Sequence, residues 1–221
     1  MKLLDLYCGG GGASVGYARA GYEVIGVDIS KKKNYPFEFI KADAIEVLSD
    51  KDFLSQFDVI HASPPCQLFT SAVHLRNAQG KSSNKLDLVA PTRDKLLEWG
   101  GIYVMENVPN APMTGIILCG SSFGLKVRRH RRFESNIKLE TLPCKHKEQG
   151  RPVGVYGSMK DNIPSGGRTA HSLEEAQEAM GIDWLGWSSL KEAIPPIYAE
   201  YVGKQILNHQ HHNLTSATSI I

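Results

Sequence analysis

Short apolar runs alternate with amphipathic stretches along the first half of the chain. Five runs rich in β-branched and aromatic residues predict strands at 3–7, 23–28, 37–41, 57–62 and 102–106. Residues 13–20, between the first two runs, have a composition compatible with a helix. Strands that alternate with helices are typical of a mostly parallel sheet covered on both faces, so the pattern predicts an α/β fold.

The pattern changes after about residue 66. Residues 67–84 are polar, with little apolar periodicity, and predict a long mobile loop of the kind that acts as a lid. Glycine and proline punctuate residues 135–185, which predicts a small irregular insert. Helical spacing returns at 193–207, after Pro195 and Pro196, and a polar tail that we expect to fray follows it.

Composition narrows these possibilities. A chain of 221 residues suits one domain with a small appended region. It has no apolar run long enough to cross a bilayer and no signal-peptide pattern after Met1, so we expect a cytoplasmic protein. The four cysteines lack Cys-x-x-Cys spacing, which predicts neither a disulfide framework nor a zinc site, and we expect no metal. A net charge of +2 does not by itself indicate nucleic-acid binding.

A candidate nucleophile directly follows the fourth predicted strand. Residues 63–67 read Ser-Pro-Pro-Cys-Gln, and the two prolines release Cys66 from the strand end. Open α/β sheets bind their ligands at this carboxyl edge, which favours a reactive thiol. Taken alone, Cys66 has a simpler alternative role as a buried small apolar residue.

A glycine-rich turn follows the first predicted strand. Residues 8–12 read Cys-Gly-Gly-Gly-Gly and lead into the first helix, so a nucleotide-like cofactor can approach the backbone there. A simple tight turn is the alternative, and Ser14 stands where the dinucleotide fingerprint needs its third glycine. Asp28 and Asp43 follow the next two strands, where carboxylates accept hydrogen bonds from ribose hydroxyls or, alternatively, cap helices.

A carboxylate and a basic cluster complete the candidate chemistry. Glu106 ends the fifth strand at the same sheet edge as Cys66, so a thiolate can add to an electron-poor ring while the acid protonates it. The alternative for Glu106 is a cap or an ion-pair partner. Residues 126–132 read Lys-Val-Arg-Arg-His-Arg-Arg. Alternate strand residues point the same way, so we expect Arg129 and Arg131 to face one site, with a solvated surface run as the alternative.

These motifs, in this order, resemble those of the cytosine-C5 DNA methyltransferases, in the compact form of bacteriophage-encoded members. The glycine turn is similar to the first motif, with Tyr7 in place of the usual phenylalanine. Residues 63–67 resemble the Pro-Cys-Gln motif, 106–108 the Glu-Asn-Val motif, 129–131 the arginine-x-arginine motif and 193–196 the last motif. Val127 and Glu192 depart from the family's usual glutamine and asparagine.

The resemblance implies a fold and a reaction. It implies a Rossmann-like S-adenosylmethionine-dependent methyltransferase sheet, with catalytic and cofactor-binding residues at 1–134, a target-recognition insert at 135–188, a returning C-terminal motif at 189–208 and a polar tail at 209–221. Cys66 would attack C6 of a flipped-out cytosine while Glu106 protonates N3, and C5 would accept the methyl group, which leaves S-adenosylhomocysteine. Arg131 would hold the cytosine carbonyl or a flanking phosphate, with Arg129 supporting it.

The resemblance also implies the residues that bind each ligand. Those implied for the cofactor are Asp5, Tyr7, Gly9, Gly11, Gly12, Asp28, Ile29, Asp43, Ala44, Pro64, Glu192 and Ala193. Those expected to bind substrate are Gln67, Ser71, Asn107, Lys145, Arg151 and Arg168. We expect a monomer that acts on double-stranded DNA in a prokaryotic or phage-infected cell. The short insert predicts a short or relaxed target sequence, and Trp184 and Trp187 are expected to be core anchors.

Three other classes of protein remain open from the sequence. The same motifs occur in a transfer-RNA cytosine methyltransferase, so RNA is an alternative substrate. A degenerate relative kept as a DNA-binding regulatory module would more readily have lost Cys66 or Glu106. A nicotinamide oxidoreductase is disfavoured by Ser14 in place of the third glycine.

Overall fold

The computed structural model describes residues 1–66, 68–69, 86–157 and 168–218, with side chains described through residue 210. The predicted lid at 67–84 falls almost wholly outside these residues, and so do Gln67 and Ser71.

The described residues form a seven-stranded sheet in the order β3-β2-β1-β4-β5-β7-β6. The parallel strands are β1 (Lys2–Leu6), β2 (Glu23–Asp28), β3 (Glu38–Lys41), β4 (Val59–Ala62) and β5 (Ile102–Asn107). The antiparallel strands β7 (Arg131–Ser135) and β6 (Ile116–Leu118) extend the edge beyond β5. All five predicted strands therefore form, within two residues of the predicted bounds.

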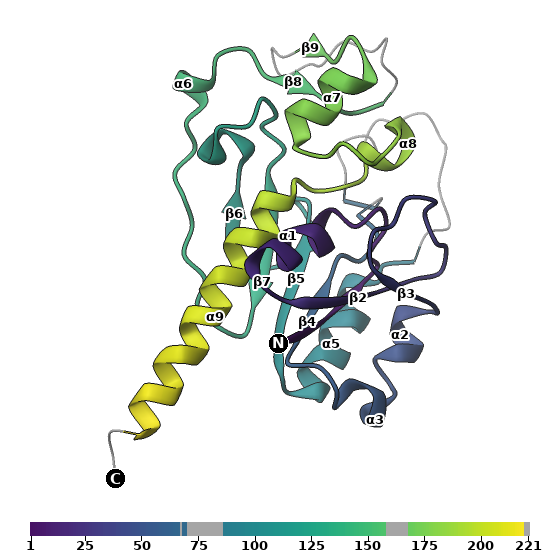
Figure 1. Ribbon diagram of the computed structural model, residues 1–221, viewed down its shortest axis with the longest axis vertical. Coiled ribbons are helices and arrows are strands. Elements are labelled where there is room, and N and C mark those ends of the chain that lie inside the picture. The colour runs from purple at the N-terminus through teal and green to yellow at the C-terminus, as the bar shows by residue number, and fades with distance from the viewer. Residues whose placement is uncertain (67, 70–85, 158–167, 219–221) are drawn as a thin grey trace.

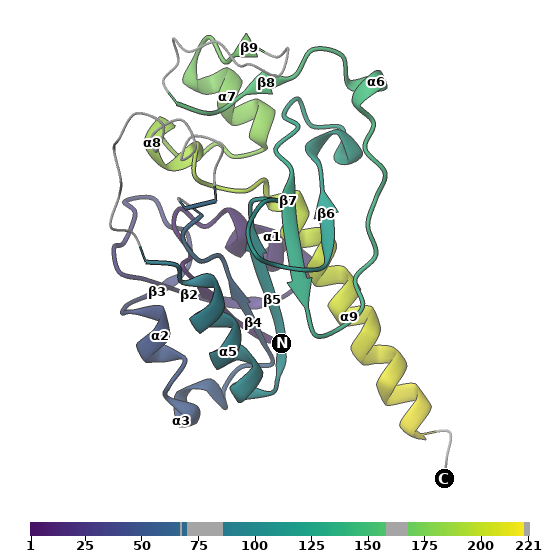
Figure 2. The same cartoon turned by 180° about the vertical axis from the view of Figure 1, so that it is seen from behind.

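Helices cover both faces of the sheet, as predicted. One face carries α1 (Gly12–Ala20) and α9 (Pro196–Thr218), which lie side by side in Figure 1. The other face carries α2 (Ala44–Val47), α3 (Lys51–Leu54) and α5 (Val89–Trp99), seen in front in Figure 2. Successive strand residues point to opposite faces, so Leu3 packs in the α1–α9 core and Leu4 in the α2–α5 core.

The strand order places a ligand crevice at the centre of the sheet. The chain runs outward from β1 to β2 and β3, then returns to β4 on the opposite side of β1. Loops at the carboxyl ends of β1 and β4 therefore diverge to opposite sides, which is where open α/β sheets bind ligands. Leu6 pairs with Ala62 and Ala62 pairs with Met105, so the turns after these three strands start side by side.

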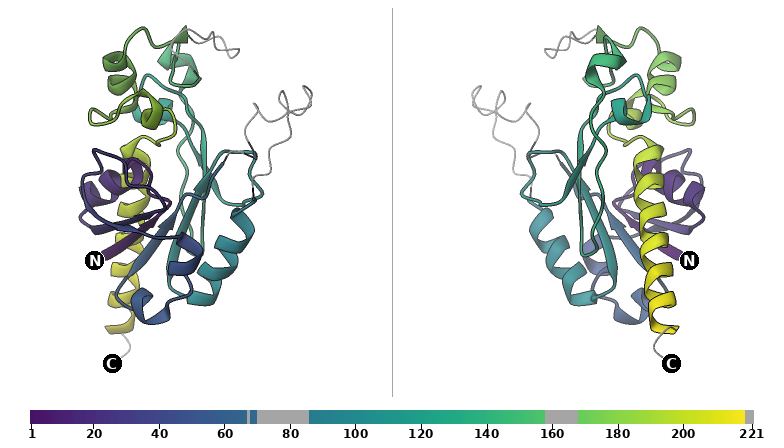
Figure 3. Two further views of the ribbon diagram at one scale, coloured as in Figure 1. Left: turned by 90° about the vertical axis from the view of Figure 1, so that its right-hand side faces the viewer. Right: turned by 90° about the vertical axis from the view of Figure 1, so that its left-hand side faces the viewer.

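The insert forms a small layer beyond the carboxyl ends of the strands (Figures 1 and 3). It contains α6 (His146–Gln149), β8 (Val153–Gly154), β9 (Arg168–Thr169), α7 (Leu173–Met180) and α8 (Trp187–Leu190). Of these elements, β8, α7 and α8 share an apolar cluster that also includes Val127. Val127, 2% exposed, therefore packs into the insert, which explains an apolar residue where the family usually has glutamine.

The two tryptophans of the insert are half-buried anchors, as predicted. Both pack against the insert's apolar cluster. Each indole nitrogen donates a hydrogen bond to a backbone carbonyl: Trp184 to Gly10 at 2.9 Å and Trp187 to Gly157 at 3.0 Å. Trp184 therefore ties the insert to the glycine turn, and Leu185 packs against the same turn.

Helix α9 corrects the predicted tail. The helix begins at Pro196 and continues through Thr218, so the expectation that the chain frays from residue 209 is wrong for residues 209–218. Residues 204–218 contain no glycine or proline, so nothing interrupts the backbone ladder. Tyr22 fixes the helix to the sheet by donating its hydroxyl proton to Gly203 O at 3.0 Å. Among the described residues, no helix has the length and apolar character needed to span a membrane.

Candidate functional site

A cavity of about 400 Å³ opens at the carboxyl ends of β1, β2, β4 and β5. It brings together the glycine turn, the proline–cysteine turn and the segment before α9, which are far apart in sequence. All the residues implied for the cofactor line it except Gly11, together with Cys66, Glu106 and Arg131. Further lining residues are Cys8, Gly10, Ala13, Ser30, Lys32, Ser63, Pro65, Leu88, Ser189 and Ile194.

Backbone geometry explains the glycine turn. Gly11 caps α1 with a φ of 84°, a left-handed conformation that glycine adopts without strain. A Cβ atom on Gly12 would lie 2.4 Å from the carbonyl oxygen of Ile194. The absence of a side chain there lets the segment before α9 close directly over the turn, as the resemblance to the last motif implies.

Asp5 is a buried carboxyl at the floor of the cavity. Its side chain is 0% exposed, and Oδ2 accepts a short hydrogen bond from the Ser14 hydroxyl. Its other oxygen, Oδ1, has no hydrogen-bond partner among the described residues. Burial raises the pKa of Asp5 to about 7, the Ser14 hydrogen bond opposes the rise, and Asp28 and Glu106 add to it. Ser14, which breaks the dinucleotide fingerprint, therefore has a defined role as the partner of Asp5.

Two further acidic residues shape the cavity rim. Asp28 accepts hydrogen bonds from Gly9 N at 3.0 Å and Ser30 N at 3.1 Å, and so holds the glycine turn against β2. Asp43 caps α2 by accepting from Ile45 N at 2.8 Å. The alternative role of Asp43 as a helix cap is thus confirmed, and Asp43 also lines the cavity.

Tyr7 directly follows β1 and lines the cavity. It has a left-handed φ of 57°, which is uncommon for a residue with a side chain. Its hydroxyl lies 2.9 Å from that of Thr92 on α5, and this contact fixes the ring.

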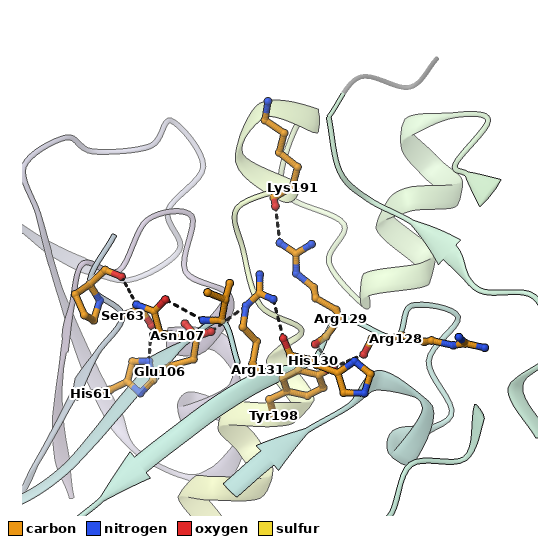
Figure 4. A network of polar contacts seen from close by, with 12 residues as sticks. His61, Ser63, Glu106, Asn107, Arg128, Arg129, His130, Arg131, Lys191 and Tyr198 are labelled. Carbon is orange, nitrogen blue, oxygen red and sulfur yellow. Dashed lines mark hydrogen bonds and ion pairs between the residues drawn. The ribbon is translucent and has the colours of Figure 1, made fainter. Parts of the chain in front are cut away.

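Cys66, Glu106 and Arg131 line the same cavity. Figure 4 shows Glu106 and Arg131 side by side. Glu106 Oε1 lies 3.0 Å from Arg131 Nε, which confirms the ion-pair alternative for Glu106. Burial raises the pKa of the Glu106 carboxyl, while Arg131 opposes the rise. Burial also raises the pKa of the Cys66 thiol, and again Arg131 is the main group that lowers it. One guanidinium thus acts on both groups.

Asn107 positions the cysteine turn. It was expected to bind substrate, but its side chain is 1% exposed and its polar atoms are already used. Nδ2 donates to Pro64 O at 2.8 Å and Oδ1 accepts from Val108 N at 2.9 Å. This corrects the expected role: Asn107 connects β5 to the turn that carries Cys66.

Arg129 does not face the cavity with Arg131, contrary to expectation. Strand β7 begins only at Arg131, and Arg129 has a left-handed φ of 38°, so strand alternation does not relate the two side chains. The Arg129 guanidinium instead donates to Val155 O at 3.2 Å and to Lys191 O. Figure 4 shows it directed toward Lys191, so Arg129 joins the insert and the returning segment to β7.

A buried polar chain behind Glu106 was not found from the sequence. His61 is 0% exposed on β4, with Nδ1 3.0 Å from the Tyr17 hydroxyl and Nε2 2.9 Å from the Ser63 hydroxyl. Ser63 in turn hydrogen-bonds Glu106. Burial lowers the pKa of His61 to about 3, so the neutral ring serves as a connector. A histidine within an apolar strand run is the sequence signal for it.

The basic residues of the insert lie elsewhere. Lys145, Arg151 and Arg168 line a second hollow of about 570 Å³, formed with Lys126 and Glu175. Arg168 is bidentate to Glu175, with Nη1 2.8 Å from Oε2. The three expected substrate residues are thus together, but they do not line the Cys66 cavity, and Arg168 is paired with Glu175.

Two of the cysteines are not isolated. Cys119 and Cys144 lie in one cluster with His130 and His146. The sequence argument against a zinc site considered only residues close together in the chain, whereas the fold gathers these four from separate loops.

Comparisons with known proteins agree with this geometry. A family model described as C-5 cytosine-specific DNA methylase matches residues 1–112. The type II methyltransferase M.FnuDI of Fusobacterium nucleatum is 40% identical over 83 residues, which are 34% of this chain and 24% of that protein. M.HgiGI of Herpetosiphon aurantiacus, also a type II methyltransferase, is 30% identical over 125 residues, which are 52% of this chain and 97% of that protein.

Among solved structures, a putative DNA modification methyltransferase encoded within a prophage of E. coli has a TM-score of 0.63 at 16% identity. That likeness covers 94% of this chain and 99% of the other, so the two share a fold. The predicted α/β methyltransferase fold is confirmed.

Proposed function

Because the chain belongs to the C-5 cytosine-specific DNA methylase family, we propose that it methylates C5 of cytosine in DNA through a covalent adduct with Cys66. One observation carries the proposal. A single cavity connects Cys66, Glu106 and Arg131 to the glycine turn, Asp28 and Asp43. A nucleophile, an acid and a candidate cofactor cradle therefore open into the same space.

The cavity fits S-adenosylmethionine, which supplies an activated methyl group when bound. The glycine turn and Ile194 lie too close for a Cβ atom at Gly12, which leaves bare backbone next to the cavity. Asp5 Oδ1 is buried without a partner among the described residues. Asp28 and Asp43 supply the carboxylates that a ribose and an adenine require. Exposed Glu192 adds a further carboxylate to the rim.

Cys66 performs the first step of the proposed reaction. The thiol loses its proton to water, and Sγ forms a bond to C6 of cytosine. Arg131 favours the thiolate because it lowers the pKa of Cys66 against the effect of burial. Asn107 holds the turn in place through Pro64 O at 2.8 Å.

Glu106 supplies the acid. As Sγ adds to C6, the carboxylic acid gives its proton to N3, and C5 becomes electron-rich enough to take the methyl group, whose bond to sulfur breaks to leave S-adenosylhomocysteine. Loss of the C5 proton to water and of the Cys66 thiolate restores the ring, and N3 returns its proton to Glu106. Burial raises the pKa of Glu106 and so favours the protonated form that this step needs, and the ion pair with Arg131 opposes this effect.

Access to the ring requires the base to leave the duplex. C6, N3 and C5 of a paired cytosine are not reachable within stacked DNA, so the base must be flipped out into the cavity. The second hollow, with Lys145 and Arg151, provides basic residues for DNA phosphates on the insert side. We propose that residues 135–188 recognise a short target.

Nucleoside mass spectrometry tests the proposal. DNA and RNA are analysed from methylation-deficient bacteria that express the wild-type chain, Cys66→Ser, Glu106→Gln or Glu46→Gln. Glu46 is exposed on α2 and provides the matched control for Glu106. We expect 5-methylcytosine in DNA with the wild-type chain and the control, none with Cys66→Ser, and about 10²–10⁴-fold slower methylation with Glu106→Gln. Methylation confined to RNA, or full activity of Cys66→Ser, would contradict the proposal.

A further inference from the structure

Two cysteines and two histidines converge about the start of β7, outside the cavity described above. The ligand atoms of Cys119, His130, Cys144 and His146 all lie within 4.8 Å of one another. Cys119 Sγ is 3.3 Å from His146 Nε2, and Cys144 Sγ is 3.5 Å from His130 Nε2. The two imidazole rings meet edge to face, with centroids 5.2 Å apart.

These distances agree with a tetrahedral metal site. Zinc binds cysteine sulfur at about 2.3 Å and histidine nitrogen at about 2.0–2.1 Å, so a sulfur and a nitrogen on one ion lie about 3.6 Å apart. Both sulfur–nitrogen contacts are close to this value. Two thiolates about one ion lie about 3.8 Å apart, so four ligand atoms that lie within 4.8 Å of one another need only a small contraction to share an ion.

The four residues come from three separate loops. Cys119 lies between β6 and the short 3-10 helix Gly120–Phe123, and His130 lies immediately before β7. Cys144 and His146 lie on the segment that enters α6. All four cysteines of the chain are free thiols, so no disulfide competes for Cys119 or Cys144.

The segment that carries Cys144 and His146 has no apolar core of its own. No residue from 140 to 151 is buried, and α6 consists of four residues without a side-chain cap. Polar contacts hold it: Lys145 N donates to Ser121 Oγ at 3.0 Å, and Gln149 Nε2 donates to Leu125 O at 2.8 Å. Where apolar burial is lacking, a bound metal can supply the folding free energy.

The Ser121 hydroxyl is placed to orient Cys119 as a metal ligand. The Ser121 hydroxyl lies 3.1 Å from Cys119 Sγ and also accepts the hydrogen bond from Lys145 N. A hydroxyl that contacts a ligating sulfur and a neighbouring loop fixes the ligand's orientation.

We infer that Cys119, His130, Cys144 and His146 bind one structural zinc ion that fastens the start of the insert to the β6–β7 hairpin. Two sulfur and two imidazole ligands leave no open position, which is typical of structural zinc and favours it over magnesium or calcium. Because His130 lies between Arg129 and Arg131, the ion would also fix the backbone from which Arg131 reaches Glu106. The inference stands apart from the proposed reaction, since metal content is measured without activity.

Metal analysis of the full chain tests this inference. The wild-type protein is produced with zinc in the medium, purified under reducing conditions and measured by inductively coupled plasma mass spectrometry. We expect one zinc ion per chain, and loss of bound zinc in the Cys144→Ser, His146→Ala double variant. His171→Ala, which replaces an exposed histidine outside the cluster, and Cys66→Ser should both keep the wild-type zinc content.

Two further measurements use the wild-type protein alone and so do not depend on whether the variants fold. Cobalt(II) added to the metal-free wild-type chain should give the visible absorption bands of tetrahedral cysteine–histidine coordination, and zinc should abolish them. A chelator should lower the melting temperature of the wild-type protein, and added zinc should restore it. Wild-type protein without zinc above the buffer blank and without cobalt bands would overturn the inference, as would an unchanged zinc content in the folded double variant.

Discussion

Replacing Asp5 with asparagine should change how stability depends on pH. In the folded protein burial raises the pKa of Asp5 to about 7 from a reference value of 3.8. Between these two values the folded state holds a proton that the unfolded state has released. The free energy of unfolding of the wild-type protein must therefore fall as pH rises through this window.

The magnitude follows from the two pKa values. Each unit of pKa difference corresponds to about 1.36 kcal/mol, so a difference of about three units amounts to roughly 4 kcal/mol. This contribution is fully present below about pH 4 and is lost above about pH 7. Asp5→Asn also alters the hydrogen bond with Ser14, but asparagine does not titrate, and the effect of this bond on the ionisation of Asp5 is already included in the pKa of about 7.

Urea unfolding at a series of pH values measures the effect. The free energy of unfolding of Asp5→Asn minus that of the wild-type protein should rise by roughly 4 kcal/mol between pH 4 and pH 8. Asp52→Asn, which removes an exposed carboxylate from α3, controls for the loss of one negative charge. A difference between Asp5→Asn and wild type that stays constant across this range would refute the assigned pKa and its origin in burial.

Three further substitutions test single contacts. Asn107→Ala leaves the buried Pro64 carbonyl without its donor, and urea unfolding should show a loss of about 1–3 kcal/mol; an unchanged midpoint would contradict this role. Trp184→Phe removes the hydrogen bond to Gly10, so calorimetry should show weaker binding of S-adenosylhomocysteine. Trp187→Phe should bind it with wild-type affinity. Equal affinities of the two variants would contradict a role of Trp184 in holding the glycine turn. Gly12→Ala places a Cβ atom against Ile194 O, so thermal unfolding should show a decrease of about 1–3 kcal/mol in the free energy of unfolding. A variant as stable as the wild-type protein would contradict the close approach of Gly12 and Ile194.

The elements that follow from local pattern were predictable from the sequence. The apolar run at 23–28 becomes β2 with the same bounds, because a central parallel strand must be apolar on both faces. The glycine turn and Cys66 could be placed together because both follow strands of one parallel sheet, and parallel strands end at one edge. Glu106 was placed at the same edge because it ends the fifth predicted strand.

What the sequence could not provide depends on contacts between distant segments. Arg129 leaves the strand pattern through a left-handed φ, which no periodicity reveals. The partners of Asn107 and His61 lie in the turn after β4 and, for Tyr17, on α1, so their roles become visible only when the fold is assembled. The cysteine–histidine cluster draws its members from three loops, and its spacing therefore matches no short motif.

Trapping the covalent adduct tests the central claim most directly. In DNA that contains 5-fluorocytosine, a fluorine replaces the C5 proton whose loss releases Cys66, so a methylated adduct cannot eliminate the enzyme. With S-adenosylmethionine present, the wild-type chain should form a complex with this DNA that survives denaturation, and peptide mass spectrometry should locate the modification on Cys66. Cys66→Ser should form none. A folded wild-type protein that methylates ordinary DNA yet forms no adduct, or forms one at another residue, would contradict the account.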